Sequence, residues 1–207
     1  MKNKLFKVML GSAAIASVSL SADSGMSSSY RPYISLGAGF AKPGSKDDVK
    51  YKWGFLGKAS LGVSYDAWRL ELEAAYRRSK VDEFTATGIK KDEAKYSVLS
   101  GMVNLFYDYS FTEEFYGYAG VGIGVAHAAY ELTLAAAPNT KSTSGKLVFA
   151  WQLMAGLGYD INEDWSLTAG YRLFNTTKVK VTEATAGELT KKAPFTHTVE
   201  IGLRYSF

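Results

Sequence analysis

The side chains that could do chemistry in this chain are charged residues that recur at every second position of otherwise apolar segments. The clearest run places Arg69, Glu71 and Glu73 between leucines and alanines. In an extended strand, residues two apart point to the same face, so these charges gather on one side. The charges that we predict to face one common interior, as an ion-pair network, are Lys58, Arg69, Glu71, Glu73, Arg77, Arg172, Glu200 and Arg204.

Three kinds of chemistry fit this set of charges. Carboxylates and cations that meet in a confined interior form ion pairs, and removal of one member is costly. The same charges around a wider interior would line a narrow polar pore. Two carboxylates could also act as general acid and base, but Glu71 and Glu73 share their face with several cations, which favours ion pairing. We therefore predict a salt-bridge plug, with the pore as the alternative.

Nucleophilic catalysis and metal binding have little support in the sequence. A hydrolytic site needs a His close to a Ser or Asp. The chain has two histidines, His127 and His197, neither of them in a His-x-Ser arrangement, and no cysteine. Two histidines offer no spacing typical of a metal site. We predict no catalytic residue, no metal and no cofactor.

The net charge of +4 gives no support to nucleic-acid binding. Three of the basic residues, Lys2, Lys4 and Lys7, precede a short apolar run at residues 8–20. A basic segment followed by such a run is typical of a secretory signal peptide. Without these lysines, 21 basic residues stand against 20 acidic ones. We predict a cleaved signal at residues 1–22, a flexible lead-in at 23–30 and one domain at 31–207.

Eight segments of that domain alternate between apolar and polar residues, as half-buried strands do. In the last one, Val199, Ile201 and Leu203 share a face opposite Glu200 and Arg204. A soluble sheet would hide the apolar face, whereas a membrane-spanning barrel turns it toward lipid and keeps the charges inside. The predicted strands cover residues 33–41, 53–65, 68–78, 95–109, 115–130, 146–160, 165–178 and 195–207.

The connections between these segments alternate in length. Those after the second, fourth and sixth segments have about two to five residues, whereas long ones cover about 42–52, 80–94, 131–145 and 179–194. Short periplasmic turns and long extracellular loops are the outer-membrane layout. The fold that we predict is all-β, an eight-stranded antiparallel transmembrane up-and-down β-barrel with a polar, side-chain-filled interior. Across that interior, the arginines of the last two strands and Glu200 should reach Lys58, Glu71 and Glu73.

Aromatic residues make up 14% of the chain and tend to stand at the ends of the apolar faces. Tyrosine and tryptophan favour the two membrane–water interfaces, where their rings meet apolar chains and their polar atoms meet water. The residues that we predict to form interfacial girdles are Trp53, Tyr65, Trp68, Tyr76, Tyr159, Trp165 and Tyr171.

Several local motifs add a family resemblance. They are Phe149-Ala150-Trp151-Gln152 with Gly156, Gly158 and Tyr159-Asp160, then Gly170-Tyr171-Arg172, and finally Glu200-x-Gly202-x-Arg204-Tyr205-x-Phe207. With these motifs, residues 31–207 resemble small eight-stranded outer-membrane barrels, which include opacity-type adhesins, the outer-membrane-protein-A-type membrane domain and bacterial surface antigens.

The resemblance implies insertion into the bacterial outer membrane after signal-dependent export. It also implies that Tyr205 and Phe207 are part of the signal read by the barrel-assembly machinery. Outer-membrane lipid and that machinery are then the expected partners, with an extracellular or host ligand possible at the long loops. The expected function is structural, adhesive or antigenic, and the alternative is a small porin.

Overall fold

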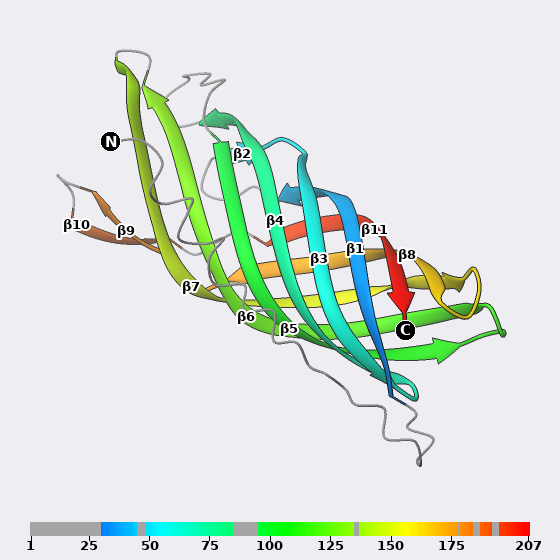
Figure 1. Cartoon of the computed structure of the whole chain (residues 1–207). Helices are drawn as coiled ribbons and strands as arrows, with labels where there is room; N and C mark the ends of the chain where they lie inside the picture. The colour runs from blue at the N-terminus through cyan, green and yellow to red at the C-terminus, as the bar shows by residue number, and fades with distance from the viewer. Residues whose placement is uncertain are drawn as a thin grey trace.

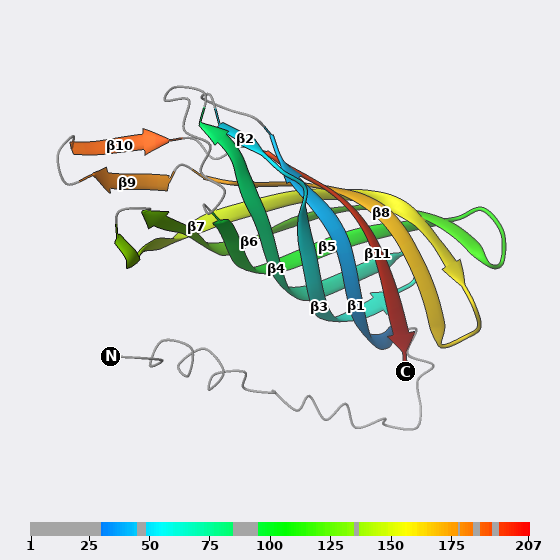
Figure 2. The ribbon, with the colours of Figure 1, turned by 90° about the horizontal axis from the view of Figure 1, so that it is seen from above.

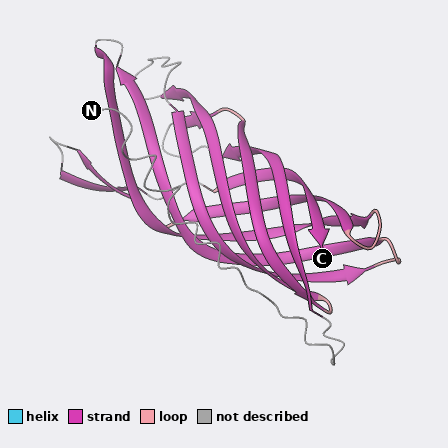
Figure 3. Ribbon diagram, in the orientation of Figure 1, coloured by secondary structure: helices cyan, strands magenta, loops and turns pink. Residues whose placement is uncertain are grey.

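The computed structural model describes residues 30–44, 49–84, 95–134, 137–177, 179–183, 187–191 and 195–207. The described residues form a closed antiparallel barrel of eight long strands (Figures 1 and 3). The barrel strands are β1 Tyr30–Pro43, β3 Gly54–Tyr65, β4 Trp68–Phe84, β5 Lys95–Ser110, β6 Phe115–Leu134, β7 Ala137–Asp160, β8 Trp165–Thr176 and β11 Thr196–Ser206. No helix among the described residues is long and apolar enough to cross a membrane. The predicted signal segment lies outside them.

The barrel is an up-and-down meander that closes between its first and last strands. Each barrel strand pairs with the next one along the chain, and β1 pairs with β11 from Tyr33 opposite Ser206 to Pro43 opposite Thr196. Figure 2 shows β1 and β11 lying side by side. The backbone N–H of Phe207 donates to the carbonyl of Pro32 at 2.9 Å. Closure pairs the edges of the sheet, which would otherwise leave backbone groups unsatisfied in lipid.

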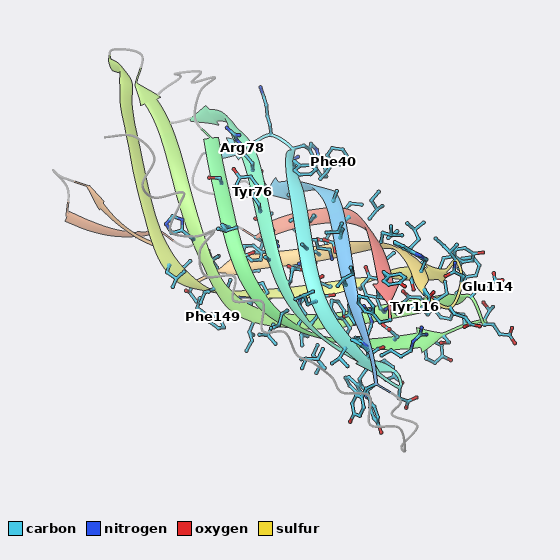
Figure 4. The ribbon with its side chains drawn as sticks, in the orientation of Figure 1. Phe40, Tyr76, Arg78, Glu114, Tyr116 and Phe149 are labelled. Atoms are coloured by element: carbon cyan, nitrogen blue, oxygen red, sulfur yellow. The ribbon has the colours of Figure 1, made fainter. Side chains whose placement is uncertain are left out.

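Alternation along each strand determines which residues enter the interior. On β1, Leu36 is 66% exposed, whereas Tyr33, three residues earlier on the other face, is 2% exposed. The large apolar side chains that face outward are leucine, isoleucine, valine and aromatic residues, among them Phe40 and Phe149, which Figure 4 labels. Such a surface is stable in hydrocarbon and costly in water, so the outward apolar face predicted from the sequence is confirmed.

The short connections lie where the sequence predicts them, and local polar chemistry forms them. Asp66 has a φ of 52°, in the left-handed region that two-residue hairpin turns require. The Thr112 hydroxyl accepts hydrogen bonds from the backbone N–H groups of Glu114 and Phe115 at 3.3 and 3.0 Å. The Asn162 side-chain oxygen likewise accepts hydrogen bonds from the backbone N–H groups of Asp164 and Trp165. We call this end of the barrel the turn side and the opposite end the loop side.

The loop predicted at residues 131–145 is wrong. Strand β6 continues to Leu134 and β7 begins at Ala137, with Glu131 opposite Thr143 in an extended hairpin. From Asn139 to Lys146 the β7 half of this hairpin has no apolar residue, so it lacks the alternating pattern that identified the other strands, because its position beyond β8 removes the need for a lipid-facing side. Pairing of backbone groups between β6 and β7 maintains the strands instead.

Two of the other long connections also contain strands. Strand β2, Val49–Tyr51, pairs with the loop-side end of β4. Strands β9, Val179–Glu183, and β10, Gly187–Lys191, form a separate hairpin on the loop side (Figure 2). Strand β4 continues to Phe84, so the loop predicted at residues 80–94 begins later than expected, and the connection to β5 at residues 85–94 lies outside the described part of the chain.

Inward aromatic rings lie flat against glycines of the neighbouring strand. Tyr33 stands opposite Gly62, and a Cβ added to that glycine would overlap the tyrosine ring. Phe106 covers Gly120 and Tyr116 covers Gly158 in the same way. Each glycine therefore leaves the space that an aromatic side chain fills, an arrangement known to stabilise glycines in sheets.

We expect Gly158→Ala to destabilise the barrel by about 1–3 kcal/mol, because the added methyl group overpacks against the Tyr116 ring. The measurement is urea unfolding of the purified barrel in detergent. Gly101→Ala is the matched control, since nothing lies within 4 Å of a Cβ at Gly101. In a Tyr116→Ala background, Gly158→Ala should cost little. An equal cost in both backgrounds would disprove the steric explanation.

Candidate functional site

The centre of the barrel interior holds four charged side chains from four strands. Arg172 on β8 donates to Glu73 on β4 at 2.6 Å, and its Nε donates to Glu200 on β11 at 2.9 Å. Lys58 on β3 lies 2.8 Å from Glu200 and 3.9 Å from Glu73. Two cations and two carboxylates thus alternate across the lumen. We call Lys58, Glu73, Arg172 and Glu200 the central quartet.

Arg172 is the most constrained member of the quartet. Its residue exposure is 0%, and a second nitrogen of its guanidinium donates to Glu200 at 3.0 Å. The Gln152 amide oxygen accepts from the same Nη1 that contacts Glu73, at 2.8 Å. A planar guanidinium suits this arrangement, because its donors point in fixed directions within one plane.

Two amide side chains extend the central quartet toward Glu71. The Gln152 amide nitrogen donates to the Asn104 side-chain oxygen at 2.7 Å, and the Asn104 amide nitrogen donates to Glu71 at 3.2 Å. The Tyr33 hydroxyl donates to the other oxygen of Glu71, also at 3.2 Å. Glu71 is 3% exposed, and no described cation lies within 4 Å of it. Neutral donors therefore satisfy this carboxylate, and the expected contact between Glu71 and a cation is wrong.

A second group of charges closes the turn side of the interior. Arg69 donates to both oxygens of Asp108, at 2.6 and 2.8 Å, the bidentate geometry that strengthens arginine–carboxylate pairs. Arg204 lies 3.7 Å from Asp160 and 3.9 Å from Asp108, and it donates to the Ser166 hydroxyl at 3.0 Å. We call Arg69, Asp108, Asp160 and Arg204 the turn-side cluster. Arg204 therefore does not cross toward Lys58, Glu71 and Glu73 as the sequence analysis expected.

Apolar side chains pack together inside the loop-side half of the barrel. Five buried residues from β5, β6, β7 and β8 pack together there, and Phe174 is the largest of them. Arg77 lies beside this group, with its guanidinium 4.1 Å from the Phe174 ring centroid and one nitrogen donating to Ser100 at 2.8 Å. We call this group the apolar layer; its members are Val98, Met102, Ala126, Ala150 and Phe174.

A small cavity remains inside the barrel. The cavity between the central quartet and the turn-side cluster has a volume of about 30 Å³ and is lined by residues that include Lys58, Glu71, Glu200 and Arg204. This volume holds about one water molecule. Side chains therefore fill the interior, as is typical of eight-stranded barrels.

The predicted ion-pair network left out four polar residues of the interior. Asp108 and Asp160 bind the two arginines of the turn side, while Asn104 and Gln152 connect the carboxylates of the centre. The alternation of inward and outward residues along each strand could have identified all four as inward-facing. Asn104 and Asp108, for example, alternate with Leu105 and Tyr107, whose side chains face outward.

The aromatic residues predicted as girdles lie on the outer surface, mostly near strand ends. On the turn side, Tyr65 stacks on Tyr30 with ring centroids 4.5 Å apart, and Trp68 meets Tyr107 at 5.0 Å. The other turn-side contacts join Tyr159 to Phe115, Trp165 to Tyr205 and Tyr205 to Phe207. Trp53 and Tyr76 are exposed toward the loop side, and Tyr171 lies near the middle of β8, bonded to His197.

The two histidines lie away from the acidic groups of the interior. His197 faces outward on β11, with its Nδ1 bonded to the Tyr171 hydroxyl. His127 also belongs to the outward-facing set of β6, opposite Leu99 and Leu147. Among the described residues, no three or more His, Cys, Asp or Glu side chains gather as metal ligands would.

Comparison with known proteins agrees with this architecture. The family model described as outer membrane protein beta-barrel domain matches residues 10–207. A 31 kDa outer-membrane immunogenic protein of Brucella melitensis is 30% identical over 166 residues, which cover 74% of this chain and 67% of the relative. A protein of the same name and the same degree of identity occurs in Brucella suis.

Two solved structures share the fold. Neisserial surface protein A has a TM-score of 0.62 at 20% identity, covering 85% of this chain and 97% of that one. A major outer membrane protein of Thermus thermophilus has a TM-score of 0.58 at 12% identity, covering 86% of this chain and 99% of that one. On the family match and the closed barrel together, this chain belongs to the outer membrane protein beta-barrel domain family and lies in the bacterial outer membrane.

Proposed function

We propose that this barrel is a non-enzymatic surface protein that acts through its loop-side segments as an adhesive or antigenic structure. The observation that carries the proposal is the extension of β6 and β7 beyond the rest of the barrel. Pairing of β7 with β8 begins only at Ala150 opposite Thr176, so residues 137–149 of β7 extend past that neighbour. Figure 1 shows this hairpin reaching beyond the other strands.

The filled interior supports this proposal over a porin. The central quartet lies in the middle of the barrel, with the turn-side cluster toward one end and the apolar layer toward the other. The cavity between the central quartet and the turn-side cluster has a volume of about 30 Å³. Ions would have to displace buried, paired charges to pass. Function then falls to the outer segments, because loops on a rigid scaffold are the usual place for binding residues.

The name of the Brucella melitensis relative also supports an exposed, antigenic surface. That relative is called immunogenic, and 74% of this chain aligns with it. The partners that we propose are outer-membrane lipid around the barrel, the assembly machinery during insertion and an extracellular or host ligand at the loop-side segments.

Labelling of single cysteines on whole cells should place the loop side outside. The chain has no cysteine of its own, so Cys introduced at Lys46, Lys90, Asn139 or Gly187 would be unique. A membrane-impermeant thiol reagent should modify these four positions. The same reagent should spare Cys at the turn-side positions Asp66 and Asn162, and the reverse pattern would invert the orientation.

Trimming the β6–β7 hairpin tests the function itself. Residues 132–142 are replaced by Asn-Gly, which joins Glu131 to its register partner Thr143 through a two-residue turn. Bacteria that display the trimmed barrel should lose attachment to cultured epithelial cells or recognition by serum raised against intact cells. Equivalent trimming of the β9–β10 hairpin is the matched comparison. Unchanged attachment and recognition in both variants would disprove the proposal.

A further inference from the structure

The ionisable side chains on the outward face of the barrel share one chemical character. Among the barrel-strand residues whose side chains the structure describes, the outward-facing ionisable groups other than tyrosines are Lys42, Arg78, His127 and His197. All four are basic types and none is acidic. All four also lie in the loop-side part of their strands. Charges on a lipid-facing surface are costly, so this one-sided arrangement calls for a ligand.

Lys42 and His197 form the centre of this arrangement. They are direct cross-strand partners on β1 and β11, and side chains so paired lie close together on one face of a sheet. The Lys42 ammonium lies 5.7 Å from the ring centroid of Trp53, which is itself exposed. The Tyr171 hydroxyl bonds Nδ1 of His197, which leaves Nε2 as the ring nitrogen without a described partner.

Arg78 continues the basic surface to the next strands. It stands opposite Phe55, which stands opposite Phe40, and both phenylalanines are more than half exposed. Figure 4 shows Arg78, Tyr76 and Phe40 near the loop-side end of the barrel. Neither Lys42 nor Arg78 forms an ion pair with any residue that the structure describes. No described carboxylate therefore competes with an external ligand for these two charges.

We propose that Lys42, Arg78 and His197 form a binding site for the phosphate groups of anionic lipid in the outer leaflet. The aromatic rings of Phe40, Phe55 and Trp53 would contact the acyl chains and the interfacial region of the same lipid. Cations beside exposed aromatic rings match a molecule whose phosphates adjoin hydrocarbon. A free anion would use only the charges, whereas a lipid headgroup uses both. The proposal rests on the orientation with the loop side outside, and not on the adhesive or antigenic function.

Native mass spectrometry of the purified barrel with diphosphoryl lipid A tests this site. We expect Lys42→Gln and Arg78→Gln each to weaken lipid A binding by about fivefold, since a cation near an anionic surface contributes on the order of that factor. Lys42→Arg, which keeps the charge, should retain binding. Arg31→Gln is the matched control, because Arg31 is an exposed cation at the turn side, beside Asp164. Heat-modifiable gel mobility confirms that each variant is folded.

Competition distinguishes the sources of phosphate. Millimolar inorganic phosphate should leave lipid A bound, and phosphatidylglycerol should bind more weakly than lipid A. Displacement of lipid A by inorganic phosphate alone would overturn the lipid assignment. Equal lipid A binding by the wild-type barrel and by the folded Lys42→Gln, Arg78→Gln double variant would overturn the site itself. Labelling of the loop side from outside would still support the surface function in that case, so the two proposals fail separately.

Discussion

Replacing Arg172 with methionine should lower the free energy of unfolding by about 3–5 kcal/mol, the range for breaking a buried ion pair by removing one partner. Arg172 is fully buried and donates to Glu73, Glu200 and Gln152. Methionine fills much of the same volume but leaves the two carboxylates facing each other, with Lys58 as the remaining cation of the central quartet. The cost comes from those uncompensated charges.

Urea unfolding followed by tryptophan fluorescence, together with gel mobility, would measure this loss. Arg204→Met is the matched control, since Arg204 is an inward arginine on the adjacent strand whose carboxylate contacts are longer, at 3.7 and 3.9 Å. It should cost clearly less. Adding Glu73→Gln to Arg172→Met should recover much of the stability, because Lys58 and Glu200, 2.8 Å apart, then remain as a balanced pair. A stable Arg172→Met barrel with no such recovery would contradict the ion-pair account.

The wild-type barrel should pass no steady current in a planar bilayer. Shortening the side chains of only one of the three groups that fill the interior should not create a current either. We expect the turn-side cluster, the central quartet and the apolar layer to obstruct the lumen in series, so that each alone keeps it closed. Glu200→Ala should therefore destabilise the barrel without creating a leak. Only a variant that trims all three groups, Arg69→Ser with Arg172→Ser and Phe174→Ser, should show resolved unitary steps.

Single-channel recording on the three single variants provides the controls for this series argument. Each should stay as closed as the wild type, provided that gel mobility confirms a folded barrel. A single variant that conducts steadily would show that its group is the only barrier. Large, steady conductance in the wild type would favour the porin over the surface function.

The number of barrel strands and the direction of their side chains could be predicted from the sequence alone. The period of two in the run from Arg69 to Arg77 determines that all its charged residues share one face. The outward apolar face then identifies lipid as the surrounding medium, since water would not tolerate residues such as Leu36 on the surface of every strand. Polar residues with local hydrogen-bonding capacity, such as Thr112 and Asn162, specified the short turns.

Only the tertiary structure decided which inward residues meet. The alternation along β11 shows that Arg204 faces inward, but it does not give the position of Arg204 along the barrel axis. The stagger of the strands places it beside Asp108 and Asp160 instead of beside Glu71. The same stagger brings Arg172 to Glu73 across the lumen, a separation of 99 residues in the chain. The β6–β7 extension was also missed, because its β7 half from Asn139 to Lys146 has no apolar residue and depends on backbone pairing with β6, which leaves no periodic signal in its side chains.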